Sequence, residues 1–106
     1  MVYTIDELKE RITPVALKYC LPAVYLFGSY ARGDATEKSD VDILVDRTGT
    51  SLIGLFEMGG LYNAFSEAVE KSIDLVTTDA LEEQSTKERT PWFVENLHKE
   101  RVKIFG

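Results

Sequence analysis

Two short motifs in the first half of the chain contain the residue types that phosphoryl-group chemistry requires. Gly28 and Ser29 follow an apolar run at residues 23–27. Ten residues separate Ser29 from Asp40, which forms an Asp-x-Asp pair with Asp42 just before a second apolar run. Backbone N–H groups at the start of a helical turn bind anions such as phosphate, and paired carboxylates bind hard divalent cations. The pattern predicts a phosphate-binding turn beside a metal-binding acidic pair.

A third carboxylate, Asp74, has apolar neighbours in a later candidate strand, where an isolated charge is costly. Strand alternation places Asp40 and Asp42 on one face, about 7 Å apart, and pairing of the two strands would bring Asp74 beside them. Such like charges repel, so the cluster should take up a proton or recruit a cation. Oxygen ligands without His or Cys favour Mg²⁺, with Mn²⁺ as an alternative, over zinc.

Each polar candidate also has a simpler explanation when it is taken alone. An Asp-x-Asp pair can be an exposed strand end, and Gly28 can be an ordinary turn glycine. Arg32 could reach a phosphate or remain a solvated surface cation. Ser39 could contact a ligand or cap the turn before the strand that carries Asp42.

Hydrophobic periodicity predicts an alternation of helices and strands. The expected elements are a helix over residues 5–19, a strand over 24–27, a turn with one helical turn over 29–35, a strand over 41–45, a helix after residue 51, a strand over 72–77, a helix over 91–99 and an edge strand over 102–105. This order predicts an α/β (α+β) fold, in which helices pack on one side of a mixed sheet of about four strands. Residues 1–106 are expected to form a single domain.

Several local signals concern the helix ends. Thr4 and Glu7 predict a capping box at the start of the first helix. Pro14 should kink that helix or start a second one with Thr13 as its N-cap. Ser51 is the expected N-cap of the next long helix, in which a Gly-Gly pair predicts a bend or a close backbone contact. The apolar residues expected on that helix are Leu52, Leu55, Phe56, Tyr62, Phe65 and Val69.

Composition restricts the class of protein. The 106 residues include 12 basic and 18 acidic ones, so the net charge of −6 argues against nucleic-acid binding. No apolar run approaches the length of a membrane span, and the N-terminus does not resemble a signal peptide. The single cysteine, Cys20, excludes an internal disulfide framework. We therefore expect a cytoplasmic protein that does not bind membranes.

The combined motifs resemble the nucleotidyltransferases of the DNA polymerase beta superfamily, and residues 28–33 with 39–42 resemble its minimal nucleotidyltransferase (MNT) branch. The resemblance implies the nucleotidyltransferase fold over almost the whole chain and ATP as the substrate. It implies that Gly28 and Ser29 hold the triphosphate and that Asp40 and Asp42 bind two Mg²⁺ ions. Asp74 would complete the second metal site and help to deprotonate the attacking hydroxyl.

Members of the minimal branch are commonly encoded beside a HEPN-domain toxin, which they neutralise as antitoxins. The resemblance thus implies AMPylation, the transfer of AMP from ATP to a tyrosine hydroxyl of a HEPN partner. A non-catalytic antitoxin that acts by contact alone, or transfer to a small molecule, remains an alternative. A glycosyltransferase-like metal site is disfavoured by the Gly-Ser turn and the short chain. The sequence leaves the acceptor, the nucleotide preference and homo-oligomer formation open.

Overall fold

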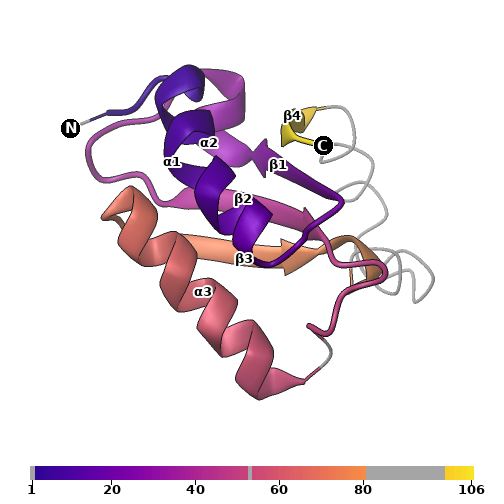
Figure 1. The fold of residues 1–106 in the computed structure, drawn as a ribbon. Helices are drawn as coiled ribbons and strands as arrows, with labels where there is room; N and C mark the ends of the chain where they lie inside the picture. Colours follow the sequence, from indigo (N-terminus) through magenta and orange to yellow (C-terminus); the bar gives the residue numbers. More distant parts are fainter. Residues whose placement is uncertain (1, 53, 81–99) are drawn as a thin grey trace.

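The computed structural model describes residues 2–52, 54–80 and 100–106. In chain order, the elements are α1 (Ile5–Lys18), β1 (Ala23–Phe27), α2 (Gly28–Arg32), β2 (Val41–Asp46), α3 (Leu55–Val69), β3 (Ile73–Thr77) and β4 (Val102–Phe105) (Figure 1). This order confirms the predicted alternation, including the single helical turn after the first strand. The helix expected over residues 91–99 lies outside the described residues.

The four strands found among the described residues form one mixed sheet in the order β3-β2-β1-β4. Strand β1 runs antiparallel to both β2 and β4, whereas β2 and β3 run parallel to each other. Helix α3 provides the crossover that two consecutive parallel strands require. The predicted mixed sheet and its edge strand β4 are confirmed.

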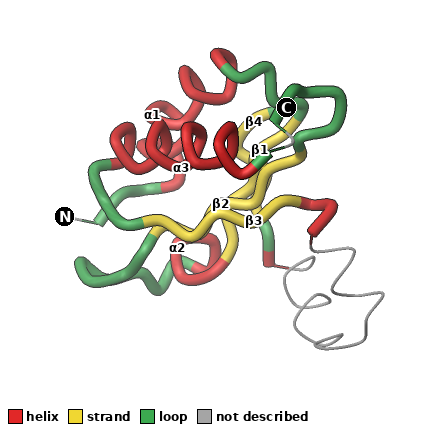
Figure 2. Tube along the Cα trace, turned by 90° about the horizontal axis from the view of Figure 1, so that it is seen from below, coloured by secondary structure: helices red, strands yellow, loops and turns green. Residues whose placement is uncertain are grey.

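Helices α1 and α3 lie side by side on one face of this sheet, as predicted (Figure 2). Every second residue of β2 points into the core beneath them, as expected for strand geometry. The largest fully buried side chains on this face come from β1 and β2 and from both helices: Leu8, Ile12, Val24, Leu26, Val41, Ile43, Val45, Leu61, Phe65 and Val69. Burying each such side chain stabilises the fold by about 1.5–3 kcal/mol. This core holds the sheet that positions the candidate site.

The N-terminal end of α1 has the predicted capping box. The Thr4 hydroxyl accepts a hydrogen bond from the Glu7 N–H at 3.1 Å, and the Thr4 N–H donates to Glu7 Oε1 at 2.9 Å. Pro14 does not start a second helix, because α1 continues through it and the Thr13 hydroxyl donates to the Lys9 carbonyl oxygen at 2.6 Å instead of capping. The buried face of α1 extends past the proline to Ala16, so core packing outweighs the local cost of Pro14.

Helix α3 begins later than the sequence predicts, with Gly54 rather than Ser51 as its N-cap. Leu52 is buried ahead of the helix, and its N–H donates to the Thr50 hydroxyl at 3.2 Å, which holds this segment in a turn. The first two helical residues, Leu55 and Phe56, are each 93% exposed, so they do not belong to the core.

The adjacent glycines inside α3 do not mark a close backbone contact. A Cβ at Gly59 would have no neighbour within 4 Å, and one at Gly60 would lie 3.6 Å from the Tyr19 hydroxyl.

In the described part of the chain, no helix is both long and apolar enough to cross a membrane.

Candidate functional site

The turn after β1 is built around a glycine that lies directly against a carboxylate. Gly28 has a left-handed φ of +69°, which L side chains rarely adopt. A Cβ at this position would collide with Oδ2 of Asp42 and lie 3.0 Å from its Cγ. The missing side chain of Gly28 therefore lets the Asp42 carboxylate lie beside the start of α2. Ser29, the next residue, is partly buried in the same helical turn.

The sheet register places two of the three predicted carboxylates opposite each other. Asp42 on β2 pairs with Asp74 on the parallel strand β3, and neighbouring strands lie about 4.8 Å apart. Asp42 is partly buried, whereas Asp74 is exposed. Asp40 is also exposed and precedes the first residue of β2. The acidic face that strand alternation predicts is thus present, next to Gly28.

The charges at this face act on Asp42. Partial burial is the largest cause that raises the pKa of Asp42, which reaches about 6. The negative charges of Asp74 and Asp40 raise this pKa further, and the guanidinium of Arg32 lowers it. All four groups are therefore close enough to interact. An ionised Asp42 is unfavourable here unless a cation offsets the local negative charge.

The carboxylates of the site are of the type that binds a hard cation, but in the structure they are not close enough together to hold one. Carboxylate oxygens without a His or Cys companion suit Mg²⁺ or Mn²⁺, and the space that Gly28 leaves accommodates the Asp42 carboxylate. Across residues 2–52, 54–80 and 100–106, however, no three acidic, His or Cys side chains are clustered tightly enough to hold an ion. Binding of a metal would require the carboxylates of Asp40, Asp42 and Asp74 to come closer together.

Arg32 lies at the end of α2 and is held by two carboxylates. Its Nε is 3.3 Å from Asp34 Oδ2, and its Nη1 is 3.4 Å from Glu100 Oε2. It is exposed, and its effect on the pKa of Asp42 places it near the acidic face. Glu100 was not a candidate from the sequence. Because the two residues are 68 positions apart, no local signal could have identified the contact.

Ser39 forms contacts that fit the simpler of its two predicted roles. Its hydroxyl accepts a hydrogen bond from the Thr36 N–H at 2.9 Å and lies 3.4 Å from the Thr36 hydroxyl. The Ser39 N–H in turn donates to the Thr36 carbonyl oxygen at 3.0 Å. The side chain thus caps the turn that leads to Asp40.

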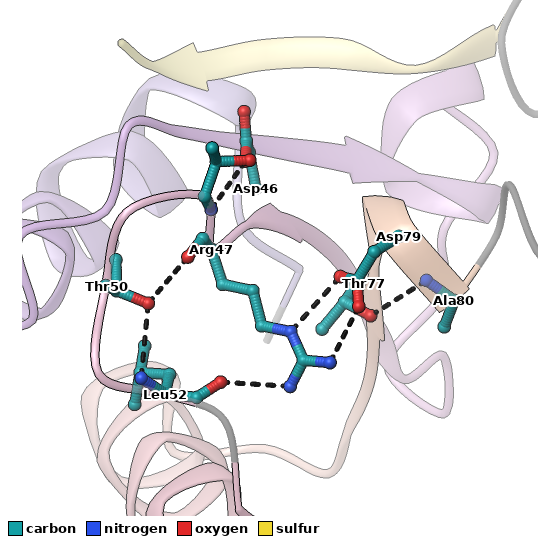
Figure 3. A network of polar contacts seen from close by, with 8 residues as sticks. Asp46, Arg47, Thr50, Leu52, Thr77, Asp79 and Ala80 are labelled. Carbon is teal, nitrogen blue, oxygen red and sulfur yellow. Dashed lines mark hydrogen bonds and ion pairs between the residues drawn. The ribbon is translucent and has the colours of Figure 1, made fainter.

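A second polar network lies at the opposite ends of β2 and β3 (Figure 3). Arg47 forms a bidentate pair with Asp79, with Nη2–Oδ2 at 2.7 Å and Nε–Oδ1 at 3.1 Å. Its Nη1 also donates to the Leu52 carbonyl oxygen at 3.0 Å, and the Thr50 hydroxyl donates to the Arg47 carbonyl oxygen at 2.7 Å. Sequence reasoning did not predict this network, which ties the turn after β2 to the segment after β3.

Comparison with known protein sequences identifies a family and several relatives. The profile of the family described as a nucleotidyltransferase domain matches residues 5–104. Two curated proteins of Methanocaldococcus jannaschii, each named "Putative protein adenylyltransferase", are similar to the chain. One is 37% identical over 78 residues, which cover 73% of this chain and 81% of the relative. The other is 37% identical over 83 residues, which cover 74% and 82%.

Solved structures share the fold. A chain in a crystal structure described as a toxin-antitoxin with AMP-PNP has a TM-score of 0.68 at 22% identity, covering 92% of this chain and 73% of that chain. A chain in the structure of a tri-AMPylated Shewanella oneidensis HEPN toxin in complex with MNT antitoxin has a TM-score of 0.64 at 18% identity, covering 97% and 73%. A structure described as a "putative minimal nucleotidyltransferase" has a TM-score of 0.63 at 24% identity, covering 94% and 95%.

Proposed function

The chain belongs to the nucleotidyltransferase-domain family, and we propose that it is a Mg²⁺-dependent protein adenylyltransferase that transfers AMP from ATP to a hydroxyl group of a protein partner. The observation that carries the proposal is the pairing of Asp42 with Asp74 across β2 and β3, with Gly28 against the Asp42 carboxylate. Two curated relatives carry the name "Putative protein adenylyltransferase", and one structural neighbour is described as a toxin-antitoxin with AMP-PNP.

Each residue of the site has a role in this reaction. The N–H groups at Gly28 and Ser29 would bind the triphosphate, with Arg32 near its terminal phosphates. Ser39 would keep the preceding turn in place. Asp40, Asp42 and Asp74 would hold Mg²⁺, since their oxygens are its preferred ligands. When bound, the metal would supply Lewis-acid stabilisation of phosphate charge and offset the repulsion among the carboxylates.

The transfer itself is a displacement at the α-phosphorus of ATP. The acceptor oxygen forms a bond to this phosphorus while the bond to the bridging oxygen breaks and pyrophosphate leaves. Asp74, the exposed carboxylate, accepts the proton of the acceptor hydroxyl. Asp42, which is partly buried, keeps its orientation against Gly28.

For the acceptor, we propose a tyrosine of a HEPN-domain toxin, so that the chain acts as the antitoxin of a cytoplasmic toxin–antitoxin pair. The support is the fold shared with chains from a toxin-antitoxin structure and from a complex of a HEPN toxin with its MNT antitoxin. Two alternatives remain: neutralisation of the partner by contact alone, and transfer of AMP to a small molecule.

The test is to incubate the protein and the product of its neighbouring gene with ATP and Mg²⁺ and to weigh the neighbour by mass spectrometry. We expect AMP-sized additions that disappear in Asp42→Asn. The matched control is Asp6→Asn, the same chemical change at an exposed position in α1, which should leave the additions intact. Neutralisation of the partner by Asp42→Asn without any mass change would favour contact alone.

A further inference from the structure

Two cations lie over one aromatic ring on the sheet face that carries Asp42. Phe27 pairs with Asp42, so strand alternation places Tyr25, two residues earlier on β1, on the same face. The Arg101 guanidinium carbon is 4.6 Å from the centre of the Tyr25 ring, and Lys103 Nζ is 5.9 Å from it. Both distances fall within the range of cation–π interaction. The ring thus orders two positive charges near the candidate active site.

These cations have no anionic partner in the part of the chain that the structure describes. The other arginines described there pair with carboxylates: Arg11 with Glu70, Arg32 with Asp34 and Glu100, and Arg47 with Asp79. Neither Arg101 nor Lys103 forms an ion pair among the described residues. Lys103 is exposed, while Arg101 and Tyr25 are partly exposed. In a chain with a net charge of −6, these two side chains form a local positive surface among the described residues.

The position of this surface separates it from the phosphate turn. Tyr25 lies three residues before Gly28 on β1, which corresponds to about 10 Å along an extended strand. Strand β4 lies two strand spacings, about 10 Å, from the β2 strand that carries Asp42. The Gly28 turn and Arg32 already provide donors for the triphosphate. A distance of about 10 Å equals the span of three residues of an extended peptide.

We propose that Tyr25, Arg101 and Lys103 form an anion-binding subsite that receives acidic side chains of the protein acceptor, two or three residues away from the target hydroxyl. The inference rests on the proposed function in that the acceptor is a protein. It extends that function by assigning the acceptor an acidic flanking sequence. Glu100, the residue before Arg101, pairs with Arg32 and so connects this subsite to the acidic face.

The first test is a binding measurement that does not depend on catalysis. Two fluorescent peptides, each with a central tyrosine flanked on both sides by three glutamates or by three glutamines, are titrated with the protein and followed by anisotropy. We expect the glutamate peptide to bind more tightly, and the double variant Arg101→Gln/Lys103→Gln to weaken its binding about fivefold. Equal binding of the two peptides to the unaltered protein would overturn the inference.

Matched control variants distinguish peptide binding at this subsite from a general effect of net charge. Lys18→Gln removes a cation that also lies over a ring, 5.7 Å from Tyr19, but on α1, and it should leave peptide binding unchanged. Arg101→Lys retains the charge and should retain most of the binding. If the double variant instead weakens ATP binding and leaves peptide binding intact, the subsite serves the nucleotide phosphates and the inference is wrong. These results hold whether or not the mass-spectrometric test detects AMP transfer.

Discussion

Substitution of Gly28 by alanine tests the central contact of the site. Two costs arise at this position. A left-handed backbone costs a residue with a Cβ about 1–2 kcal/mol. The new Cβ would also collide with Asp42 Oδ2, and moving that side chain away from its rotamer costs about 0.5–1.5 kcal/mol more. We expect Gly28→Ala to lower the free energy of unfolding by about 1.5–3.5 kcal/mol.

The chain contains a close control for the backbone cost. Gly33 has a φ of +88°, and a Cβ there would have no neighbour within 4 Å. Gly33→Ala should therefore show the conformational cost alone, about 1–2 kcal/mol. Urea unfolding of both variants at neutral pH, followed by circular dichroism, gives the difference that belongs to Asp42. AMP transfer should fall in Gly28→Ala and persist in Gly33→Ala.

A double-mutant cycle provides the stricter measurement. In an Asp42→Ala background the carboxylate is absent, and the remaining Cβ would lie 3.4 Å from the new one, an ordinary contact. Gly28→Ala should then cost no more than Gly33→Ala. The reasoning is refuted if Gly28→Ala and Gly33→Ala destabilise the unaltered protein equally, or if the Asp42→Ala background does not reduce the cost at Gly28.

Three further predictions concern charge and buried polarity. The folded-state pKa of Asp42 is about 6, above its ordinary value of 3.8. Its ionisation therefore has no effect on stability below about pH 4, opposes folding increasingly between about pH 4 and 6, and opposes it in full above about pH 6. Asp42→Asn should thus raise the free energy of unfolding by about 1 kcal/mol at pH 7.5, after allowance for solvent screening, and not at pH 4, as urea titrations at both values would show. Arg47→Gln removes the bidentate pair with Asp79 and the bond to the Leu52 carbonyl, and it should destabilise the fold by about 1–2 kcal/mol in the same assay. A loss below about 0.5 kcal/mol, as is usual for a surface substitution, would contradict this. The buried Tyr30 hydroxyl has no hydrogen-bond partner among the described residues, so Tyr30→Phe should leave thermal stability unchanged or raise it by up to about 1 kcal/mol, and a clear loss would show that the hydroxyl is satisfied.

Much of the site could be predicted because its signals are local. Asp74 stands out as a charge in an apolar strand, and the period of two along residues 41–45 places Asp42 on the face opposite the core. The mixed sheet and the helices on one face follow from hydrophobic periodicity. The family is inferred from the resemblance of the motifs, and the profile match confirms it. The roles of the individual site residues stay predictions.

The contacts that could not be predicted join distant parts of the chain. The start of α3 depends on Leu52, which is buried in a turn that Arg47 and Thr50 hold, so the local capping signal at Ser51 is overridden. The contact between Gly28 and Asp42 depends on the β1–β2 register, which sequence pattern alone does not define. Such pairings are set by tertiary packing rather than by local propensity.

The two ends of the β2–β3 pair have opposite electrostatics, and one register accounts for both. Asp74 follows Asp42 by the same 32 positions by which Asp79 follows Arg47. At one end this register brings like charges together, which is unfavourable, and at the other it forms a bidentate ion pair, which is favourable. A slip by two residues would keep the apolar face buried, but in either direction it would break the pair between Arg47 and Asp79. One direction would place Asp74 opposite Leu44, and the other would place it opposite Asp40. The ion pair therefore favours the register that keeps the two carboxylates opposed, and a site whose charges repel is held in place by an attraction at the far ends of the same strands.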